Sequence, residues 1–230
     1  ETKQMCIYGL GEMHIDVITS KLKNRFGTTV TISPAKVPYR ETIKKKVQVE
    51  GKHKKQSGGH GQYGHVKIEF SPGTTDGLEF TETIFGGSVP KNFHPAVEKG
   101  LQESMAKGVL AGYPVIGIKA NLFDGSYHDV DSSEMSFKLA ANLAFKEGMK
   151  QGGAVLLEPV GELRVSIPTS YSGDIMGDIS KRRGRIMGMS ESGRKGFTVI
   201  EAEVPSAEMG TYAIQLRAMT QGRGSYSFNF

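Results

Sequence analysis

The spacing of apolar side chains changes along the chain, and this spacing predicts where helices and strands lie. Residues 11–25 carry an apolar side chain at every third or fourth position, which predicts an amphipathic helix. The apolar segment Met5–Tyr8 before it and the β-branched run Thr28–Ile32 after it each predict a short strand. A strand–helix–strand unit is too small to enclose a core, so we expect residues 1–35 to be the end of a domain that starts outside this sequence.

After a linker with two prolines the pattern changes to strict alternation, which is typical of a half-buried strand. Val47 and Val49 alternate with polar neighbours in a basic strand that runs to Lys55. Beyond a glycine-rich turn the alternation resumes at Val66, Ile68 and Phe70. The two runs predict a hairpin with an extended tip.

Further elements complete a second domain over residues 36–157. Strands are predicted for Leu78–Ile84 and Val115–Leu122, and helices for Pro90–Lys107 and Ser133–Lys150. The first helix carries an apolar stripe formed by Phe93, Val97, Leu101 and Met105. In the second helix one face is traced by Met135, Leu139, Asn142 and Lys146. The pattern predicts an α+β layer in which helices cover one sheet.

A third domain is predicted over residues 158–230, after the interruption Leu157-Glu158-Pro159. Its predicted strands lie at Leu163–Ile167, Ile186–Met189, Phe197–Val204 and Tyr226–Phe230. Its predicted helices are Gly173–Arg183, ended by Gly184, and Ser206–Thr220. The order βαββαβ is that of the ferredoxin-like split unit, so the fold class is multi-domain α+β.

Charge is concentrated in two segments of this chain of 230 residues, which has a net charge of +5. Arg40–Lys67 holds eight basic and two acidic residues, and Lys181–Lys195 holds six basic and one acidic. Such clusters suit a polyanionic partner, because each neutralised phosphate releases counterions. Solvated charged faces are the alternative for either cluster alone. The candidate basic contacts are Lys52, Lys54, Lys55, Lys181, Arg182, Arg183 and Arg185.

Other bulk features narrow the protein class. No apolar run reaches the roughly 18 residues that span a bilayer, and the first residues lack the charged head and apolar stretch of a signal peptide, so we expect neither a signal peptide nor a membrane partner. The single cysteine, Cys6, cannot form an internal disulfide, which is compatible with the cytoplasm. We expect no metal site, because His14, His53, His65 and His94 lack ligand spacing.

The segment Gly59-His60-Gly61-Gln62-Tyr63-Gly64 matches a glycine-rich nucleotide-binding pattern. A dinucleotide site requires a helix after this pattern, whereas the alternation that follows predicts a strand. No Walker A motif and no further kinase motif occurs. We therefore interpret the segment as a hairpin tip whose glycines allow close approach of a partner and whose side chains can stack on or hydrogen-bond to RNA.

A second polar loop is predicted over Gly125–Ser133. It covers most of the connection Phe123–Val130 and extends to the start of the following helix. It contains serine, histidine and aspartate, but adjacent residues of one loop do not converge as a hydrolytic triad does, so we expect no catalytic residue. Asp131 or Ser132 is predicted to cap the following helix, and Asp131 has capping-box spacing to Glu134.

The cluster at Lys181–Arg185 can satisfy the preceding helix dipole, although four basic residues in five positions favour RNA or a partner protein.

Four strings in this order resemble the translation elongation factor G family, and the resemblance covers essentially the whole chain. They are Gly9–His14, Gln56–Gly64, Tyr127–Ser133 and Gly173–Gly184. The resemblance implies the end of a ferredoxin-like third domain, a ribosomal-protein-like α+β fourth domain and most of a ferredoxin-like fifth domain that lacks its C-terminal helix. It also implies that GTP and Mg belong to a GTPase domain of the parent protein, and that this chain holds no cofactor.

The same resemblance implies partners and contacts. The fourth domain is expected to act as a lever that reaches the decoding region of the small ribosomal subunit and contacts tRNA and mRNA during translocation. The fifth is expected to meet the GTPase-associated region of the large subunit, and the protein is expected to be a cytoplasmic monomer. The expected RNA-contacting tip residues are Gln56, Ser57, Gly58, Gly59, His60, Gly61, Gln62, Tyr63, Tyr127, His128 and Asp129.

Three alternatives are weighed against the translocase. A paralogue that acts in ribosome recycling stays open, since its loops can look alike. A tetracycline-protection factor is disfavoured by the Tyr127–Ser133 string. A free-standing RNA-binding module is disfavoured by the incomplete first domain.

Overall fold

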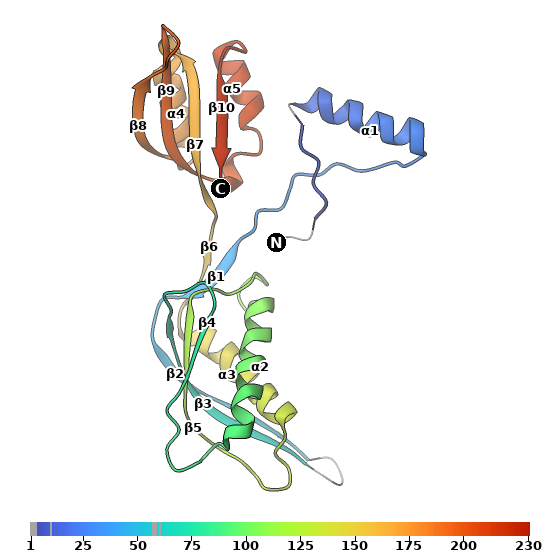
Figure 1. Cartoon of the computed structure of the whole chain (residues 1–230), viewed down its shortest axis with the longest axis vertical. Coiled ribbons are helices and arrows are strands. Elements are labelled where there is room, and N and C mark those ends of the chain that lie inside the picture. Colours follow the sequence, from blue (N-terminus) through green and yellow to red (C-terminus); the bar gives the residue numbers. More distant parts are fainter. Residues whose placement is uncertain (1–3, 10, 57–58, 60) are drawn as a thin grey trace. The chain divides into compact units, whose positions relative to one another are not determined.

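The computed structural model describes residues 4–9, 11–56, 59 and 61–230. The chain forms two compact units (Figure 1). Unit 1 comprises Glu1–Pro38 together with Glu158–Phe230, and unit 2 comprises Tyr39–Leu157. Among the described residues, no helix combines the length and apolar content that crossing a bilayer requires.

The first part of unit 1 contains the predicted helix but neither predicted strand. Helix α1 spans Glu12–Phe26 and ends at Gly27, whose left-handed φ of 64° suits a helix C-terminus. The segments Met5–Tyr8 and Thr28–Ile32 lie outside any helix or strand. Met5, Tyr8 and Ile32 are exposed, and no described strand pairs with these segments, so their apolar pattern is not stabilised as a sheet.

Unit 2 is built on a four-stranded sheet with the order β2-β3-β5-β4. The strands are β2 (Val47–Lys55), β3 (Gln62–Pro72), β4 (Leu78–Glu82) and β5 (Ile118–Ser126). The pairs β2–β3 and β3–β5 are antiparallel, and β4–β5 is parallel. The predicted hairpin is therefore confirmed, with Lys55 opposite Gln62 at its tip. A second, two-stranded sheet joins β1 (Arg40–Ile43) to β6 (Ala154–Leu157).

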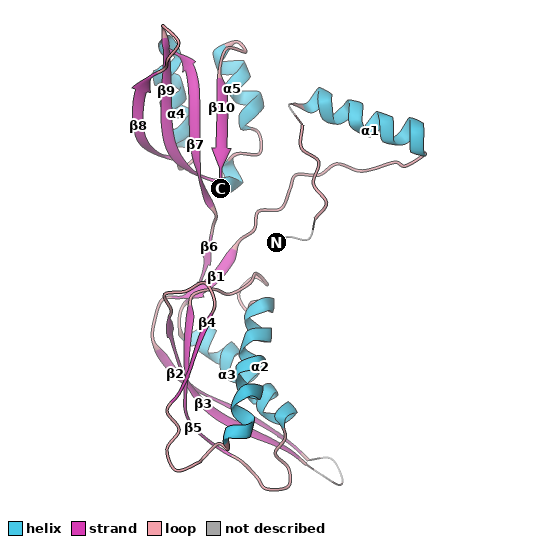
Figure 2. Ribbon diagram, in the orientation of Figure 1, coloured by secondary structure: helices cyan, strands magenta, loops and turns pink. Residues whose placement is uncertain are grey.

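Two helices pack with the main sheet of unit 2 (Figure 2). A short 3-10 turn, Lys91–Phe93, precedes α2 (His94–Lys107), and α3 spans Glu134–Gln151. The predicted stripe of α2 is confirmed, since Val97, Leu101 and Met105 are buried. The core combines it with apolar side chains of the sheet and α3, including Val66, Ile68, Phe70, Ile118, Leu122, Phe137, Ala140, Ala144 and Phe145.

Two details of unit 2 differ from the prediction. Strand β5 begins and ends later than expected, because residues 118–126 pair with β3 as far as Ser126. Helix α3 buries Phe137 and its alanines rather than the face of Met135, which is exposed. Small alanines let the helix lie close to the sheet, and a pattern search for large apolar residues does not detect such a face.

The remainder of unit 1 is the predicted ferredoxin-like sheet, with the order β10-β7-β9-β8 and antiparallel pairing throughout. Its strands are β7 (Val160–Pro168), β8 (Arg185–Glu191), β9 (Phe197–Pro205) and β10 (Ser225–Asn229). Its helices are α4 (Ser172–Lys181) and α5 (Tyr212–Thr220). Ile175, Ile179, Tyr212 and Leu216 pack on the strands as a separate core. Helix α5 starts later than predicted, because Ser206–Glu208 forms its own 3-10 turn and Gly210 follows it.

Candidate nucleic-acid interface

Two connections of unit 2 lie at the same end of its sheet (Figure 1). The first joins β2 to β3, and the second joins β5 to α3. Both loops are shorter than predicted. Gln62, Tyr63 and Gly64 belong to β3, and Gly125 and Ser126 end β5, because backbone pairing continues to Lys55–Gln62 and His65–Ser126. The loops themselves are residues 56–61 and 127–133, called here the first and second tip loops.

Asp131 and Ser132 fasten the second tip loop to the end of the first tip loop and to the start of β3. The Gly61 N–H donates to Asp131 Oδ1 at 3.0 Å, and the Tyr63 N–H donates to the Asp131 carbonyl at 2.8 Å. The Ser132 hydroxyl donates to the Tyr63 carbonyl at 2.9 Å. One of these hydrogen bonds joins the second tip loop to Gly61, and the other two hold it against the start of β3.

Local hydrogen bonds also orient His128 within the second tip loop. The backbone N–H of His128 donates to Ser132 Oγ at 2.9 Å. The N–H groups of Val130 and Asp131 donate to His128 Nδ1 at 3.3 and 3.2 Å. Since Nδ1 accepts these bonds, the neutral ring carries its proton on Nε2. With 56% of its side chain exposed, His128 can offer this N–H as a donor to a partner.

Polar side chains beside His128 are held in place as well. The Tyr63 hydroxyl lies 2.8 Å from Ser126 Oγ, and the Tyr63 ring centre lies 6.4 Å from that of His128. Lys52 Nζ lies 5.9 Å from the centre of the Tyr63 ring. Gln62 Oε1 lies 2.8 Å from His53 Nε2, which leaves the Gln62 amide nitrogen as a donor for a partner.

The three glycines of the nucleotide-like pattern meet needs of the fold. Gly59 has a φ of 80°, which few other residues adopt. A Cβ on Gly61 would lie 2.8 Å from the Asp131 carboxylate, and one on Gly64 would lie 2.3 Å from the Ser136 carbonyl oxygen. Strand β3 follows the pattern, as predicted, so the helix N-terminus that a dinucleotide site requires is not at this position.

Lysines of the first basic segment differ in whether a carboxylate pairs with them. Lys46 pairs with Glu69 at 2.8 Å, and Lys67 pairs with Asp124 at 2.8 Å. The hydrogen bond from Lys67, with help from the Gly125 N–H, lowers the pKa of Asp124 to about 2. In contrast, Lys52, Lys54 and Lys55 at the end of β2 are exposed, and no described carboxylate forms an ion pair with them. Unpaired positive charge therefore lies beside the tip loops.

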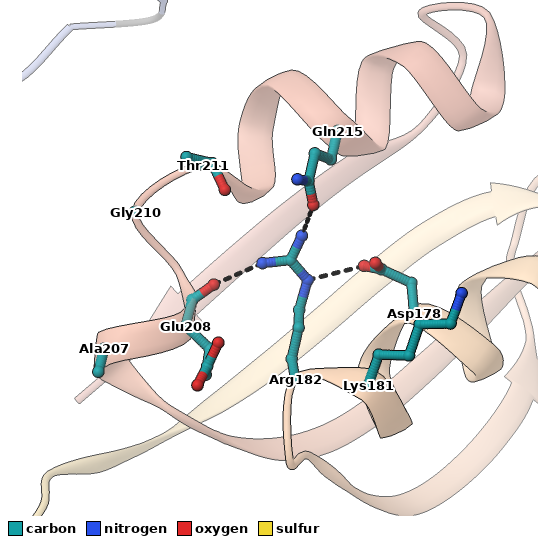
Figure 3. A pocket seen from close by; sticks show the side chains of 8 residues that line it. All are labelled: Asp178, Lys181, Arg182, Ala207, Glu208, Gly210, Thr211 and Gln215. Atoms are coloured by element: carbon teal, nitrogen blue, oxygen red, sulfur yellow. Dashed lines mark hydrogen bonds and ion pairs between the residues drawn. The ribbon is translucent and has the colours of Figure 1, made fainter.

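Arg182 in the second basic segment is a structural residue, which corrects its prediction as an RNA contact. It is only 7% exposed. Figure 3 shows its guanidinium between Asp178, the Glu208 carbonyl and Gln215, and all three accept its hydrogen bonds. A polar pocket of about 340 Å³ lies over this cluster. Because these partners occupy three of its donors, Arg182 stabilises the junction of α4 and α5.

Arg183 differs from its neighbours in backbone and pairing. It adopts a φ of 61°, so it takes the left-handed position that was predicted for Gly184. Its guanidinium pairs with Glu158 at 2.5 Å and with Glu208 at 3.0 Å, and these hydrogen bonds raise its pKa. Lys181 and Arg185 are exposed. Of the four basic residues predicted as contacts in this segment, only Lys181 and Arg185 are both exposed and without an ion pair to a described carboxylate.

The remaining predicted tip residues are placed as follows. Tyr127 is 45% exposed, and Gln56 and Asp129 are exposed. Ser57, Gly58 and His60 lie outside the described residues. Within the described part of the chain, no group of three or more histidine, cysteine or carboxylate side chains could hold a metal ion.

Comparison with known proteins supplies the family. Models of elongation factor G match three consecutive segments: domain III at residues 1–34, domain IV at residues 35–153 and the C-terminus at residues 155–230. The chain belongs to the elongation factor G family. A crystal structure of a protein from Thermus thermophilus is 45% identical with a TM-score of 0.83, and the match covers 97% of this chain and 33% of that one. The chain thus spans about a third of the length of that relative.

Asp131 and Ser132 are functional candidates in this family member that the sequence patterns did not identify. They were expected to cap α3, but the N-cap is Ser133, whose hydroxyl accepts the Ser136 N–H. The capping prediction was wrong because Asp131 and Ser132 bind β3 instead. The bond from Gly61 to Asp131 joins positions 70 residues apart, and no local motif signals such a contact.

Proposed function

We propose that this chain is the ribosome-binding C-terminal portion of an elongation-factor-G-type translocase. It promotes GTP-dependent movement of tRNA and mRNA from the A to the P site and from the P to the E site, with the tip of unit 2 inserted into the decoding region of the small subunit. The observation that supports this most is the fastened pair of tip loops, which presents His128 and Gln62 beside unpaired lysines.

The tip works by position and by hydrogen bonding, without covalent chemistry. The Nε2–H of His128 and the side-chain amide of Gln62 donate to phosphate or 2′-hydroxyl oxygens, and Lys52, Lys54 and Lys55 neutralise phosphates nearby. Such contacts carry no sequence information, which suits a factor that moves every codon. Because Asp131 ties the second loop to Gly61 and Ser132 ties it to β3, the tip can resist slippage of the codon–anticodon duplex.

The rest of the mechanism lies with other parts of the parent protein. GTP hydrolysis, with its Mg, belongs to a GTPase domain, and the C-terminal sheet of unit 1 meets RNA of the GTPase-associated region on the large subunit. The exposed Lys181 and Arg185 are its candidate contacts. By itself the chain binds ribosomes weakly and with strong salt dependence, and it does not translocate. Its location is the cytoplasm, where ribosomes act.

The test is His128→Ala in the full-length factor, with GTP hydrolysis, translocation and ribosome recycling measured separately. Loss of the Nε2 donor is expected to slow translocation about tenfold while GTP hydrolysis is retained. Val130→Ala is the matched control, because Val130 is 62% exposed in the same loop and donates to His128 through its backbone N–H, which alanine keeps. An unchanged translocation rate would contradict the role of His128. A defect in recycling alone would favour the recycling paralogue.

A further inference from the structure

A third loop, residues 83–90, lies at the same end of unit 2 as the two tip loops (Figure 1). It joins β4 to the turn before α2. At its start, the Thr83 N–H donates to the Leu122 carbonyl of β5 at 2.9 Å. At its end, Val89 is 1% exposed, and its carbonyl lies 3.0 Å from His94 Nε2. Both ends of the loop are therefore anchored to the core.

This anchor connects the third loop to the strand that leads into the second tip loop. A Cβ on Gly125 of β5 would lie 2.5 Å from Val89 Cγ2, so Val89 packs directly against the end of that strand. The third loop thus shares its base with the loop that carries His128.

The middle of the third loop exposes Phe85, whose surface is 94% accessible. Gly86 and Gly87 follow it with φ values of 69° and 71°. Two consecutive left-handed residues turn the chain sharply, and only glycine does so without strain. No atom lies within 4 Å of a Cβ placed on either glycine, so the turn projects into open space. An aromatic ring is therefore held outside the core on a loop whose ends are fixed.

We propose that Phe85 is a stacking residue for an unpaired RNA base at this end of unit 2. The proposal rests on the proposed function and adds a third contact to it. An aromatic ring needs only one free face to stack on a base, and every base offers such a face whatever the sequence. This property matches the sequence-independent contacts of the two tip loops.

The surroundings of Phe85 fit RNA better than a protein partner. A protein hot spot is usually ringed by further contacts that exclude water. Around Phe85, Thr83, Gly86 and Gly87 are small and exposed, and the exposed Lys91 follows the loop. A lone exposed ring without such a rim suits stacking on a single base, as in proteins that bind single-stranded nucleic acid.

The first experiment measures binding of the 230-residue chain to isolated small ribosomal subunits at low salt. Phe85→Ala is expected to weaken binding about tenfold, as is typical for loss of one stacked base. Phe85→Trp is expected to keep the affinity, whereas Phe85→Leu behaves as Phe85→Ala, because stacking requires an aromatic face. Phe26→Ala is the control, since Phe26 is 73% exposed on α1 in the other unit.

A second substitution separates failure of this inference from failure of the proposed function. Lys54→Ala removes an unpaired charge beside the tip loops. If Lys54→Ala weakens binding and Phe85→Ala does not, the stacking role is wrong and the ribosome-binding tip stands. If the chain does not bind, or if neither variant changes binding, the stacking role of Phe85 and the ribosome-binding role of the tip are both wrong.

Photocrosslinking then identifies the class of partner. With p-benzoylphenylalanine in place of Phe85, the bound chain is expected to crosslink to ribosomal RNA. A crosslink to a ribosomal protein, or no crosslink while binding is retained, overturns the proposal. The fold should tolerate these changes, because the ring is 94% exposed, and circular dichroism provides the check.

Discussion

At the scale of single residues, Asp131 connects the two tip loops through its side chain, and its backbone carbonyl binds Tyr63 at the start of β3. Asp131→Ala removes the acceptor for the Gly61 N–H but leaves the backbone bond from Tyr63. We expect exchange of the Gly61 amide hydrogen to accelerate about tenfold, while the free energy of unfolding falls by roughly 1 kcal/mol. Hydrogen exchange followed by NMR measures both effects. Asp129→Ala in the same loop should leave the Gly61 amide protected from exchange. Equal exchange rates in the two variants would show that the Asp131 side chain does not protect Gly61.

Glu41 of β1 organises the loop that follows α2 in unit 2. Its carboxylate is fully buried. Burial disfavours the charged form, yet N–H groups of the loop after α2 outweigh this cost and lower the pKa of Glu41 below 4.5. The donors, at 2.7–3.0 Å, are Val109, Leu110, Ala111 and Tyr113. The loop is therefore organised around one negative charge.

This arrangement predicts a pH dependence of stability. A carboxyl group with a lowered pKa binds fewer protons in the folded state, so its contribution is complete above about pH 4.5 and is lost as the pH falls through the folded pKa. Glu41→Gln should lower the free energy of unfolding by about 2 kcal/mol at pH 7 and flatten its decline below pH 4.5. Urea unfolding at several pH values tests this. Glu98→Gln is the control, because that carboxylate accepts one exposed bond from Gln102, and identical pH profiles for Glu41→Gln and the parent chain would refute the prediction.

At the scale of elements, two glycines set the distance between α3 and the hairpin. A Cβ on Gly51 of β2 would lie 2.1 Å from the Ala140 carbonyl oxygen, and one on Gly64 of β3 would lie 2.3 Å from that of Ser136. Gly51→Ala and Gly64→Ala should each destabilise unit 2 by about 1–3 kcal/mol, because backbone must shift to admit the methyl group. Chemical denaturation measures the loss. Gly77→Ala, with no atom within 4 Å of the new Cβ, should stay close to the parent, and an equal loss at Gly77 would mean that helix contact is not the cause.

The elements differ in how well the sequence predicts them. Alternation at Val66, Ile68 and Phe70 predicts β3 correctly, because one face of this strand is buried against helices. The β-branched run Thr28–Ile32 predicts a strand that does not form, because a strand also requires a partner and none of the described strands pairs with it. For the site, the tip loops and His128 can be located from local motifs. The hydrogen bond between Gly61 and Asp131 and the burial of Arg182 depend on contacts between segments that are distant in the sequence, and local patterns do not encode such contacts.

At the scale of the whole molecule, each unit has a hydrophobic core of its own. Ile68 belongs to the core of unit 2 and Ile179 to the core of the C-terminal sheet of unit 1, and both are fully buried. Separate cores predict two thermal transitions in scanning calorimetry. Replacement of a buried isoleucine by alanine costs about 2–5 kcal/mol. Ile68→Ala should therefore lower the midpoint of one transition, and Ile179→Ala that of the other.

The assignment of each transition follows from the variants themselves. Glu41→Gln should act on the same transition as Ile68→Ala, because Glu41 binds a loop of unit 2. Val130→Ala, with a side chain that is 62% exposed, should move neither transition. A single transition, or equal shifts of both transitions with either isoleucine variant, would show that the units unfold together. Independent unfolding would mean that the tip-bearing unit is stabilised by its own contacts, so the hydrogen bonds that present His128 would not depend on the state of the C-terminal sheet.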